Sequence, residues 1–244
     1  MKSLKSAEQC GLEDPVFIFA RGGSKGLPNK NILPFHGKPL ITWTIELAKK
    51  ISLSQRVLVS TDSLEIAEIS AASGAEVPYI RPSHLAADTS PEWHSWRYGL
   101  DFMRGKGESL PKAMVILPVT APLRNVNDIQ RCIETFIKYS PDAVITVSEA
   151  RRNPAFNMVL KDDHHTVQLV SPPNRSVSRR QDAPVMWDVA TVGYVLDPKF
   201  VLSKNSLFEG NVKAVVVPPE RAVDIDSALD FEIAEYLMGR QINA

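Results

Sequence analysis

The feature that most constrains this chain is an apolar run that breaks abruptly into a glycine-rich, basic loop. Residues 16–20 read Val-Phe-Ile-Phe-Ala, which predicts a buried parallel strand. Residues 21–26 hold three glycines, so their backbone can turn tightly and approach a ligand closely. Successive N–H groups in such a turn form a concavity that binds anions. Because Arg21, Lys25 and Lys30 add positive charges that suit phosphate oxygens, the predicted ligand is a polyphosphate.

The spacing of this loop excludes two common phosphate-binding motifs. Neither Gly-x4-Gly-Lys-Ser/Thr nor Gly-x-Gly-x-x-Gly is present. A plain surface turn with solvated basic residues is the alternative interpretation. It leaves the coincidence of a strand, three glycines and three cations without an explanation, so a phosphate-binding loop is favoured.

Strands and helices alternate at short intervals after the loop. The expected helices cover residues 40–50, 63–73, 90–104, 127–139 and 227–240. The expected strands cover residues 56–60, 76–80, 113–117, 142–147, 188–196 and 212–217. This order predicts an α/β fold with a mainly parallel sheet, and in such sheets ligands bind beyond the carboxyl ends of the strands.

Residues 151–184 interrupt the alternation. They are irregular and rich in Pro, Arg, Asp and Asn, with two short strand-like pieces at 156–160 and 166–170. A hairpin this small does not fold alone, so it must pack on the sheet or on a second copy, and we expect it to form a homodimer contact. Residues 1–14 are mostly polar and are expected to form a flexible tail. Residues 15–244 are expected to form a single domain that carries the hairpin as an insertion.

The composition excludes several classes of function. Lys+Arg and Asp+Glu are equal at 28 each, so nothing indicates a nucleic-acid-binding surface or a polybasic membrane anchor. No apolar run approaches the roughly 20 residues that span a bilayer. The two cysteines form no metal or redox motif, which is typical of a cytoplasmic protein. The sequence also lacks a His-x-x-x-His pair and a Gly-x-Ser-x-Gly nucleophile elbow.

Two carboxylates near the end of the chain predict a metal site. Asp224 and Asp226 alternate around Ile225, so in an extended segment both side chains point the same way. Their charges repel each other unless they face water or a cation lies between them, and Mg²⁺ commonly bridges protein carboxylates and substrate phosphates. The alternative is that Asp226 and Ser227 only cap the last helix. The phosphate loop upstream favours Mg²⁺ (or Mn²⁺).

Several of these segments resemble the acylneuraminate cytidylyltransferases, the enzymes that make CMP-sialic acids. Residues 20–31 resemble their nucleotide-binding loop, and Asp-Ile-Asp at 224–226 resembles their metal motif. Residues 80–89 are similar to the family's Arg-Pro-x-x-Leu-Ala-x-Asp segment, 120–124 to its Thr-Ser-Pro-Leu-Arg loop, and 180–181 to its Arg-Gln pair. The resemblance covers nearly the whole chain and implies a three-layer, Rossmann-like nucleotidyltransferase fold with an inserted dimerisation hairpin.

The resemblance also implies a reaction and the residues that serve it. CTP and a 2-keto-3-deoxy sugar acid, such as a sialic-acid-like nonulosonic acid, would give CMP-sugar and pyrophosphate. A structural role is the alternative for Arg81 and for Arg124. The implied residues are catalytic Arg21, Lys25 and Lys30; nucleotide-binding Ala20, Arg21, Gly22, Gly23, Ser24, Lys25, Arg81 and Asp88; substrate-binding Thr120, Arg124, Arg180 and Gln181; and metal-binding Asp224 and Asp226.

Two departures from the family pattern concern the sugar. Members that use N-acetylneuraminate usually have Gln where this chain has Pro118, and Asn-Gly where it has Ala190-Thr191. Because losing side-chain amides changes substrate preference strongly in a buried site, we expect a different nonulosonic acid, of legionaminic or pseudaminic type. Kdo, another sugar or nucleotide, and a non-catalytic nucleotide-binding role remain alternatives. The intact sets of cations and carboxylates favour an enzyme over a mere binder.

Overall fold

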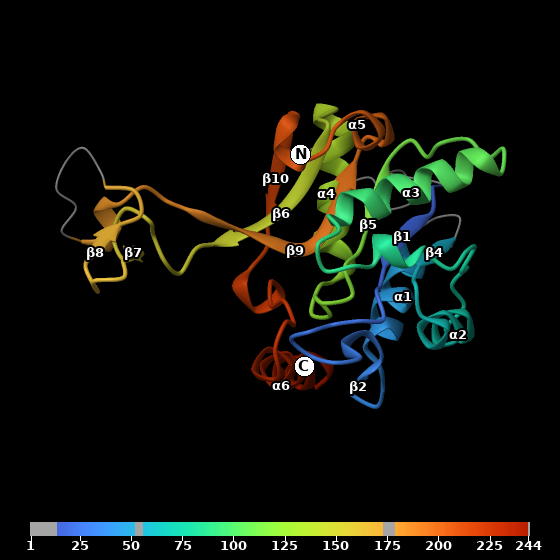
Figure 1. Ribbon diagram of the computed structural model, residues 1–244, viewed down its shortest axis with the longest axis horizontal. Helices are drawn as coiled ribbons and strands as arrows, with labels where there is room; N and C mark the ends of the chain where they lie inside the picture. The colour runs from blue at the N-terminus through green and yellow to red at the C-terminus, as the bar shows by residue number, and fades with distance from the viewer. Residues whose placement is uncertain (1–13, 52–55, 173–178, 244) are drawn as a thin grey trace, which may run out of the picture.

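A six-stranded sheet forms the centre of the molecule (Figure 1). The computed structural model describes residues 14–51, 56–172 and 179–243. The sheet contains β1 (Val16–Phe19), β4 (Val57–Ser60), β5 (Met114–Ile116), β6 (Ala143–Glu149), β9 (Trp187–Leu196) and β10 (Val212–Val216). Their order is β10-β6-β9-β5-β1-β4. β9 runs antiparallel to β5 and β6, and the other pairs are parallel, which confirms the predicted mainly parallel sheet.

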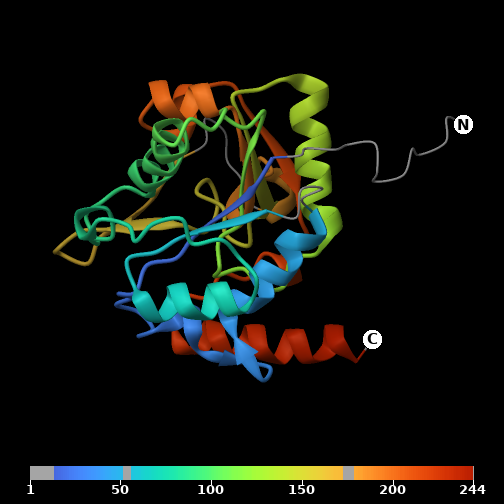
Figure 2. The same ribbon diagram turned by 90° about the vertical axis from the view of Figure 1, so that its right-hand side faces the viewer.

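Helices cover both faces of the sheet and give three layers (Figure 2). α1 (Leu40–Ile51), α2 (Leu64–Ala72), α4 (Val126–Tyr139) and α6 (Ala228–Ile242) pack on one face, and α3 (Glu92–Gly105) and α5 (Pro198–Ser203) on the other. Side chains alternate along each strand: Val16 and Ile18 join the first core, and Phe17 between them joins the second. Among the described helices, none has the length and apolar character needed to cross a bilayer.

Local signals set the helix ends. Ser63 caps α2, because its hydroxyl accepts a hydrogen bond from the Ile66 N–H. At α6 the Ser227 hydroxyl accepts from the Asp230 N–H, while the Asp230 carboxylate accepts from the Ser227 N–H. This reciprocal pair is a capping box. The predicted starts of α2 and α6 are therefore confirmed.

The strand predicted at 76–80 is wrong. Only its two ends, Glu76 and Ile80, make isolated bridges, to β4 and to the residue that follows β4. Pro78 lies midway between them and has no N–H with which to continue the ladder. The segment therefore runs beside the sheet without becoming a strand.

The segment between β6 and β9 projects from the body as an arm, residues 150–186 (Figure 1). Its tip is an antiparallel pair, β7 (Val159–Lys161) and β8 (Val167–Leu169), and its base is the outer part of β6 and β9. These strands are shorter than the pieces predicted at 156–160 and 166–170. Apolar side chains on the tip are open to solvent: Leu160 is 55% exposed and Val167 is 57% exposed. The hairpin therefore lies away from the central sheet, and its contact with a second copy stays a prediction.

The predicted N-terminal tail lies outside the described residues, apart from Asp14. The Asp14 carboxylate accepts hydrogen bonds from the backbone N–H groups of Lys112 and Ala113, at 2.8 and 3.1 Å. Asp14 thus fixes the entry to β1 beside the entry to β5, which is its neighbour in the sheet.

Candidate active site

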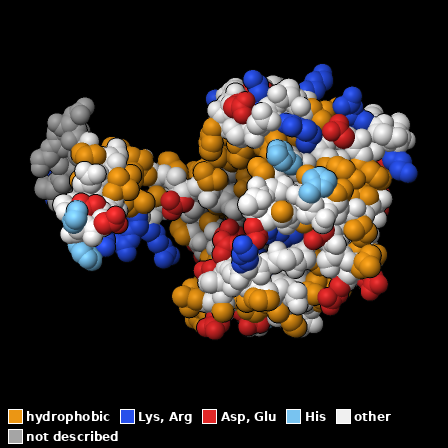
Figure 3. Space-filling model, viewed as in Figure 1, with side chains coloured by type: hydrophobic (Ala, Val, Ile, Leu, Met, Phe, Trp, Pro, Cys, Tyr) orange, Lys and Arg blue, Asp and Glu red, His pale blue; other side chains and the backbone are white. Residues whose placement is uncertain are grey.

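A cleft of about 640 Å³ opens at the carboxyl ends of β1 and β5. Figure 3 shows basic and acidic side chains gathered where this face of the molecule is hollowed. The glycine-rich loop forms the first wall. Residues 81–95 form the second wall, and residues 118–120 with part of β9 form the third. Four segments that are distant in sequence therefore meet around one space.

Two hydrogen bonds between side chains and the backbone hold the glycine-rich loop in place. The Gly22 N–H donates to Asp62 Oδ1 at 2.9 Å. Asn31 Nδ2 donates to the Arg21 carbonyl at 2.9 Å, an interaction that sequence reasoning missed. Among the predicted loop residues, Arg21, Ser24 and Lys25 line the cleft, Ala20 is buried, Gly22 packs on Ser63, and Gly23 has open space beside it.

The loop also meets the acidic segment near the end of the sequence. A Cβ at Gly26 would lie 2.3 Å from the Asp226 carbonyl oxygen, so only glycine fits there. Lys30 is 8% exposed, and its Nζ donates to the Ile225 carbonyl and to Asp226 Oδ1, the latter at 2.9 Å. The structure thus brings the two most specific motifs of the sequence into one site.

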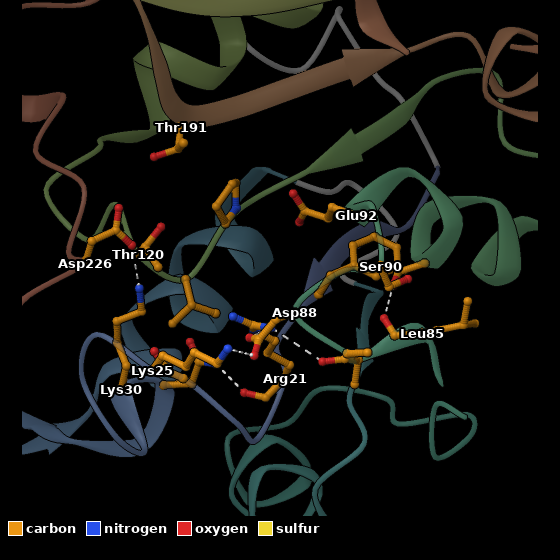
Figure 4. Close-up of a pocket in the computed structure, with 18 of the residues that line it drawn as sticks. Arg21, Lys25, Lys30, Leu85, Asp88, Ser90, Glu92, Thr120, Thr191 and Asp226 are labelled. Carbon is orange, nitrogen blue, oxygen red and sulfur yellow. Dashed lines mark hydrogen bonds and ion pairs between the residues drawn. The ribbon is translucent and has the colours of Figure 1, made fainter. Parts of the chain in front are cut away.

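Two cations of the loop converge on one carboxylate. Arg21 Nη1 and Lys25 Nζ each lie 2.7 Å from Asp88, on different oxygens (Figure 4). Lys25 and then Arg21 hold the pKa of Asp88 below its usual range. Asp88 was expected among the nucleotide-binding residues. In this structure its carboxylate lies where an anionic ligand of these two cations would lie.

The predicted metal-binding pair has two different environments. The Asp226 side chain is 76% exposed and pairs with Lys30. Burial raises the pKa of Asp224, while the hydroxyls of Thr120 and Thr191 favour its ionised form. Asp224 Oδ1 is buried and has no hydrogen-bond partner among the described residues. One oxygen of the pair is therefore left for a ligand that the protein itself does not supply.

These two carboxylates fit a divalent cation. Mg²⁺ takes one or two protein carboxylates and completes its shell with water and substrate phosphates, which suits an orphaned oxygen beside a cationic loop. Within the described part of the chain, no group of three or more His, Cys, Asp or Glu side chains is placed to hold a metal. The N-cap of α6 is Ser227, so Asp226 does not serve as the helix cap.

Arg81 and Glu92 face the cleft from the second wall. Arg81 is 5% exposed, its nearest acidic oxygen is Asp62 Oδ1 at 3.7 Å, and its Nε has no hydrogen-bond partner among the described residues. Burial lowers its pKa. Glu92 reaches solvent through the open cleft, yet the protein around it raises its pKa, against the opposing effects of the Trp96 N–H and the Arg81 charge. Sequence reasoning missed Glu92, because its only local signal was a place in the first turn of a helix.

Arg124 is buried behind the third wall and bonds its backbone. It is 4% exposed and does not line the cleft. Its guanidinium donates to the Ala121 and Val192 carbonyls at 2.8 Å each, and to the Pro118 carbonyl. These bonds correspond to the structural alternative for Arg124. The side chains that line this wall are Pro118, Val119, Thr120, Thr191 and Tyr194.

Arg180 and Gln181 are not brought to this cleft. They lie on the arm and line a separate hollow with residues at the base of the arm, among them Glu149 and Met186. Arg180 Nη2 donates to the Ala150 carbonyl at 3.1 Å. The predicted sugar-acid residues are therefore divided between the cleft, which holds Thr120, and the arm.

Comparison with known proteins places the chain in a family. A family model for cytidylyltransferases matches residues 16–95. The chain is 36% identical over 221 residues to the post-translational flagellin modification protein B of Campylobacter coli, and 34% identical over 221 residues to the CMP-N,N'-diacetyllegionaminic acid synthase of Campylobacter jejuni; each match covers 91% of this chain and 93% of the relative.

The fold is also that of a solved structure, CMP:2-keto-3-deoxy-manno-octonic acid synthetase complexed with CTP. The two superpose with a TM-score of 0.68 at 16% identity, over 93% of this chain and 99% of that one. At 16% identity this likeness shows the fold alone, and the assignment to a family rests on the sequence relatives. Together with the cleft that joins the glycine-rich loop to Asp-Ile-Asp, they show that the chain belongs to the acylneuraminate cytidylyltransferase family.

Proposed function

We propose that this cytidylyltransferase joins CTP to a nonulosonic acid of the legionaminic type, giving CMP-sugar and pyrophosphate. One observation carries the proposal: the cationic loop and the carboxylate segment share a single cleft, joined where Gly26 packs on the Asp226 carbonyl. Cations and a metal-binding pair at one site suit the transfer of a nucleotidyl group from a triphosphate.

The third wall of the cleft supports the choice of sugar. Pro118 lines it at one place where family members that use N-acetylneuraminate carry an amide side chain, and Ala190, buried next to the lining residue Thr191, stands at the other. Neither residue can supply the paired donor and acceptor of an amide. The 34% identical relative makes CMP-N,N'-diacetyllegionaminic acid, so we rank a legionaminic-type acid first, and a pseudaminic-type acid and Kdo after it.

The reaction forms a bond from the anomeric oxygen of the sugar to the α-phosphorus of CTP. It breaks the bond from that phosphorus to the departing pyrophosphate, and the attacking hydroxyl loses its proton. Arg21 and Lys25 would exchange Asp88 for the phosphates and offset charge on the leaving group. Lys30 holds Asp226 in position beside them. Catalysis then comes from alignment and charge neutralisation, with no protein nucleophile.

A divalent cation is part of the proposal. Asp224 and Asp226 would hold Mg²⁺ (or Mn²⁺), and the support is the orphaned Asp224 Oδ1 next to a second carboxylate. When bound, such an ion polarises a phosphoryl oxygen.

The proposed function also includes a homodimer. The arm exposes apolar side chains that a second copy would cover, and it carries Arg180 and Gln181 away from the cleft of its own chain. The cleft of a second copy is then the sugar-acid site open to them, where an arginine fork suits the sugar carboxylate. Cys132 is a buried free thiol, in keeping with a cytoplasmic enzyme.

The test is release of pyrophosphate from CTP with Mg²⁺ and a panel of legionaminic, pseudaminic and N-acetylneuraminic acids and Kdo. We expect turnover with a legionaminic-type acid and loss of turnover when EDTA removes the metal. Turnover with N-acetylneuraminate alone would contradict the interpretation that the third wall, which lacks amide side chains, favours a different sugar. Binding of CTP without turnover of any sugar in the panel would favour a binding role over the proposed reaction.

A further inference from the structure

The last helix, α6, carries apolar side chains on both its inner and its outer face. The inner face belongs to the first core, where Ala234 and Met238 are buried. On the outer face, Leu229, Ile233 and Tyr236 are 64%, 43% and 68% exposed. In Figure 2 α6 runs along the bottom of the molecule, and no described element lies beyond its outer face. A helix that is apolar all round is normally buried, so this face suits a partner outside the described chain.

The spacing of these side chains gives α6 a continuous outer stripe. Leu229, Ile233 and Tyr236 are separated by four and then three residues, so they share one side of the helix. Exposed charges lie one turn away from Tyr236 in each direction, with Glu232 toward the amino end and Arg240 toward the carboxyl end. The stripe therefore has an apolar centre between an acidic and a basic group.

A shallow hollow of about 700 Å³ lies beside the stripe. Its lining includes Glu232, Tyr236, Gly239 and Arg240 on α6, and His36 in the turn that precedes α1. Gly239 has no side chain to fill this space, although glycine is unfavourable inside a helix. The hollow can therefore receive an apolar side chain that arrives from outside.

Two copies of this face match each other when their α6 helices run antiparallel. With a two-fold axis at Tyr236, Ile233 of one copy lies opposite Gly239 of the other, and Arg240 lies opposite Glu232. Each copy then places an apolar side chain at the hollow of the other, and each charge meets an opposite charge. A parallel pair would set Glu232 against Glu232, so the charges favour the antiparallel arrangement.

We propose that the outer face of α6 is a contact between two copies of this chain, packed antiparallel around Tyr236. The arm leaves the body on a different side from α6 (Figure 1), so a pair of chains joined through their arms can bind a second pair through α6. The inference goes beyond the proposed function and requires neither nucleotide nor metal. Because the stripe is small, the association should be weak, with a Kd on the order of 10 µM.

Sedimentation velocity on the full-length chain, from about 1 to about 200 µM, tests the contact. The parent protein and all variants carry Leu160→Asp, which weakens the arm contact, so they differ only in α6. Glu232→Arg and Arg240→Glu each set like charges against each other, and each alone should weaken association at least about tenfold. An equimolar mixture of these two variants restores both opposite-charge pairs and should recover the parent affinity to within about threefold.

Two further variants separate charge from packing. Tyr236→Ala removes the centre of the stripe and should weaken association at least about tenfold, while the thermal midpoint hardly moves because this side chain is exposed. Glu134→Arg is the matched control for charge, at an exposed glutamate within α4. It should associate as the parent does.

A parent protein that stays monomeric at the highest concentration, or folded α6 variants that associate like the parent, would overturn the contact. Weakening by both charge variants without recovery in their mixture would overturn the antiparallel pairing. Failure of the proposed function has a different signature: no pyrophosphate release from any sugar in the panel, while the mixture of charge variants still associates.

Discussion

Apolar side chains of strands are buried in the body of the molecule but exposed to solvent on the arm. In the body, Met114, Val115 and Ile116 of β5 are at most 2% exposed, because helices cover both faces of the sheet. On the arm, Val159 and Leu160 of β7 are 53% and 55% exposed. A short apolar strand therefore indicates that a surface will be covered, but it does not indicate which surface covers it.

The same contrast divides the predicted site. Arg21, Lys25 and Lys30 belong to the body and meet at one cleft without help from another chain. Arg180 and Gln181 belong to the arm and remain outside that cleft. In the proposed function, the body alone supplies the nucleotide site, whereas the arm serves sugar binding only if it reaches the cleft of a second copy.

The largest difference should appear in folding stability. Ile116→Ala opens a cavity in the body and should lower the free energy of unfolding by about 2–5 kcal/mol. Leu160→Ala on the arm should change it by less than about 0.5 kcal/mol when the protein is dilute enough to be monomeric. Urea unfolding curves measure both. An equal loss at the two positions would remove the distinction between body and arm.

The next effect concerns the chemistry of the cleft. Lys25→Ala should lower turnover about a hundredfold to a thousandfold, because one charge on the departing pyrophosphate goes unopposed. The Lys25 side chain is 83% exposed, so the thermal midpoint should hardly move. Lys50→Ala, an exposed lysine at the end of α1, is the control and should keep the full rate. A Lys25→Ala enzyme at full rate would exclude this lysine from the mechanism.

A third change tests the arm as an interface. Leu160→Asp places a charge in the exposed apolar patch and should weaken self-association at least about tenfold, since burying an unpaired charge is costly. Light scattering across a dilution series reports the mass. Phe208→Asp, at an apolar residue of the body that is 71% exposed, should leave the mass unchanged. If the Leu160→Asp protein loses sugar affinity but keeps CTP affinity, the arm serves the sugar side of a partner.

The smallest expected effect comes from removing the carboxylate that pairs with the two cations of the glycine-rich loop. Asp88→Asn removes the carboxylate that pairs with Arg21 and Lys25, so pyrophosphate should inhibit the variant about two- to fivefold more strongly. The size is modest because exposed ion pairs are weak. Inhibition constants for pyrophosphate measure the change, and weaker inhibition would mean that Asp88 positions the cations for the phosphates.

Most of the fold was readable from the sequence because it rests on local patterns. The apolar run before the glycine loop, the alternation of strands and helices, and the caps at Ser63 and Ser227 each depend on a few adjacent residues. The false strand at 76–80 shows the limit of that approach. Its apolar residues suggested a ladder, but the missing N–H of Pro78 prevents one.

The residues of the candidate site could be predicted only in part from the sequence. Its loop and its Asp-Ile-Asp segment have recognisable spacing, but Glu92, Thr191 and Tyr194 reach the cleft from separate elements and share no motif. Arg124 looked like a ligand for substrate, yet its donors are taken by carbonyls that only the folded chain brings near. Such roles depend on long-range packing, which sequence spacing does not encode.

The contact between the first loop and the acidic segment has a consequence for synthesis of the protein. Lys30 and Asp226 are separated by 196 positions along the chain. A growing polypeptide therefore carries its phosphate loop long before it carries the carboxylates that complete the site. If the proposed function holds, we expect activity only after the segment that carries Asp224 and Asp226 has been synthesised and has docked, and we expect a nucleotide bound across both segments to oppose unfolding of the protein.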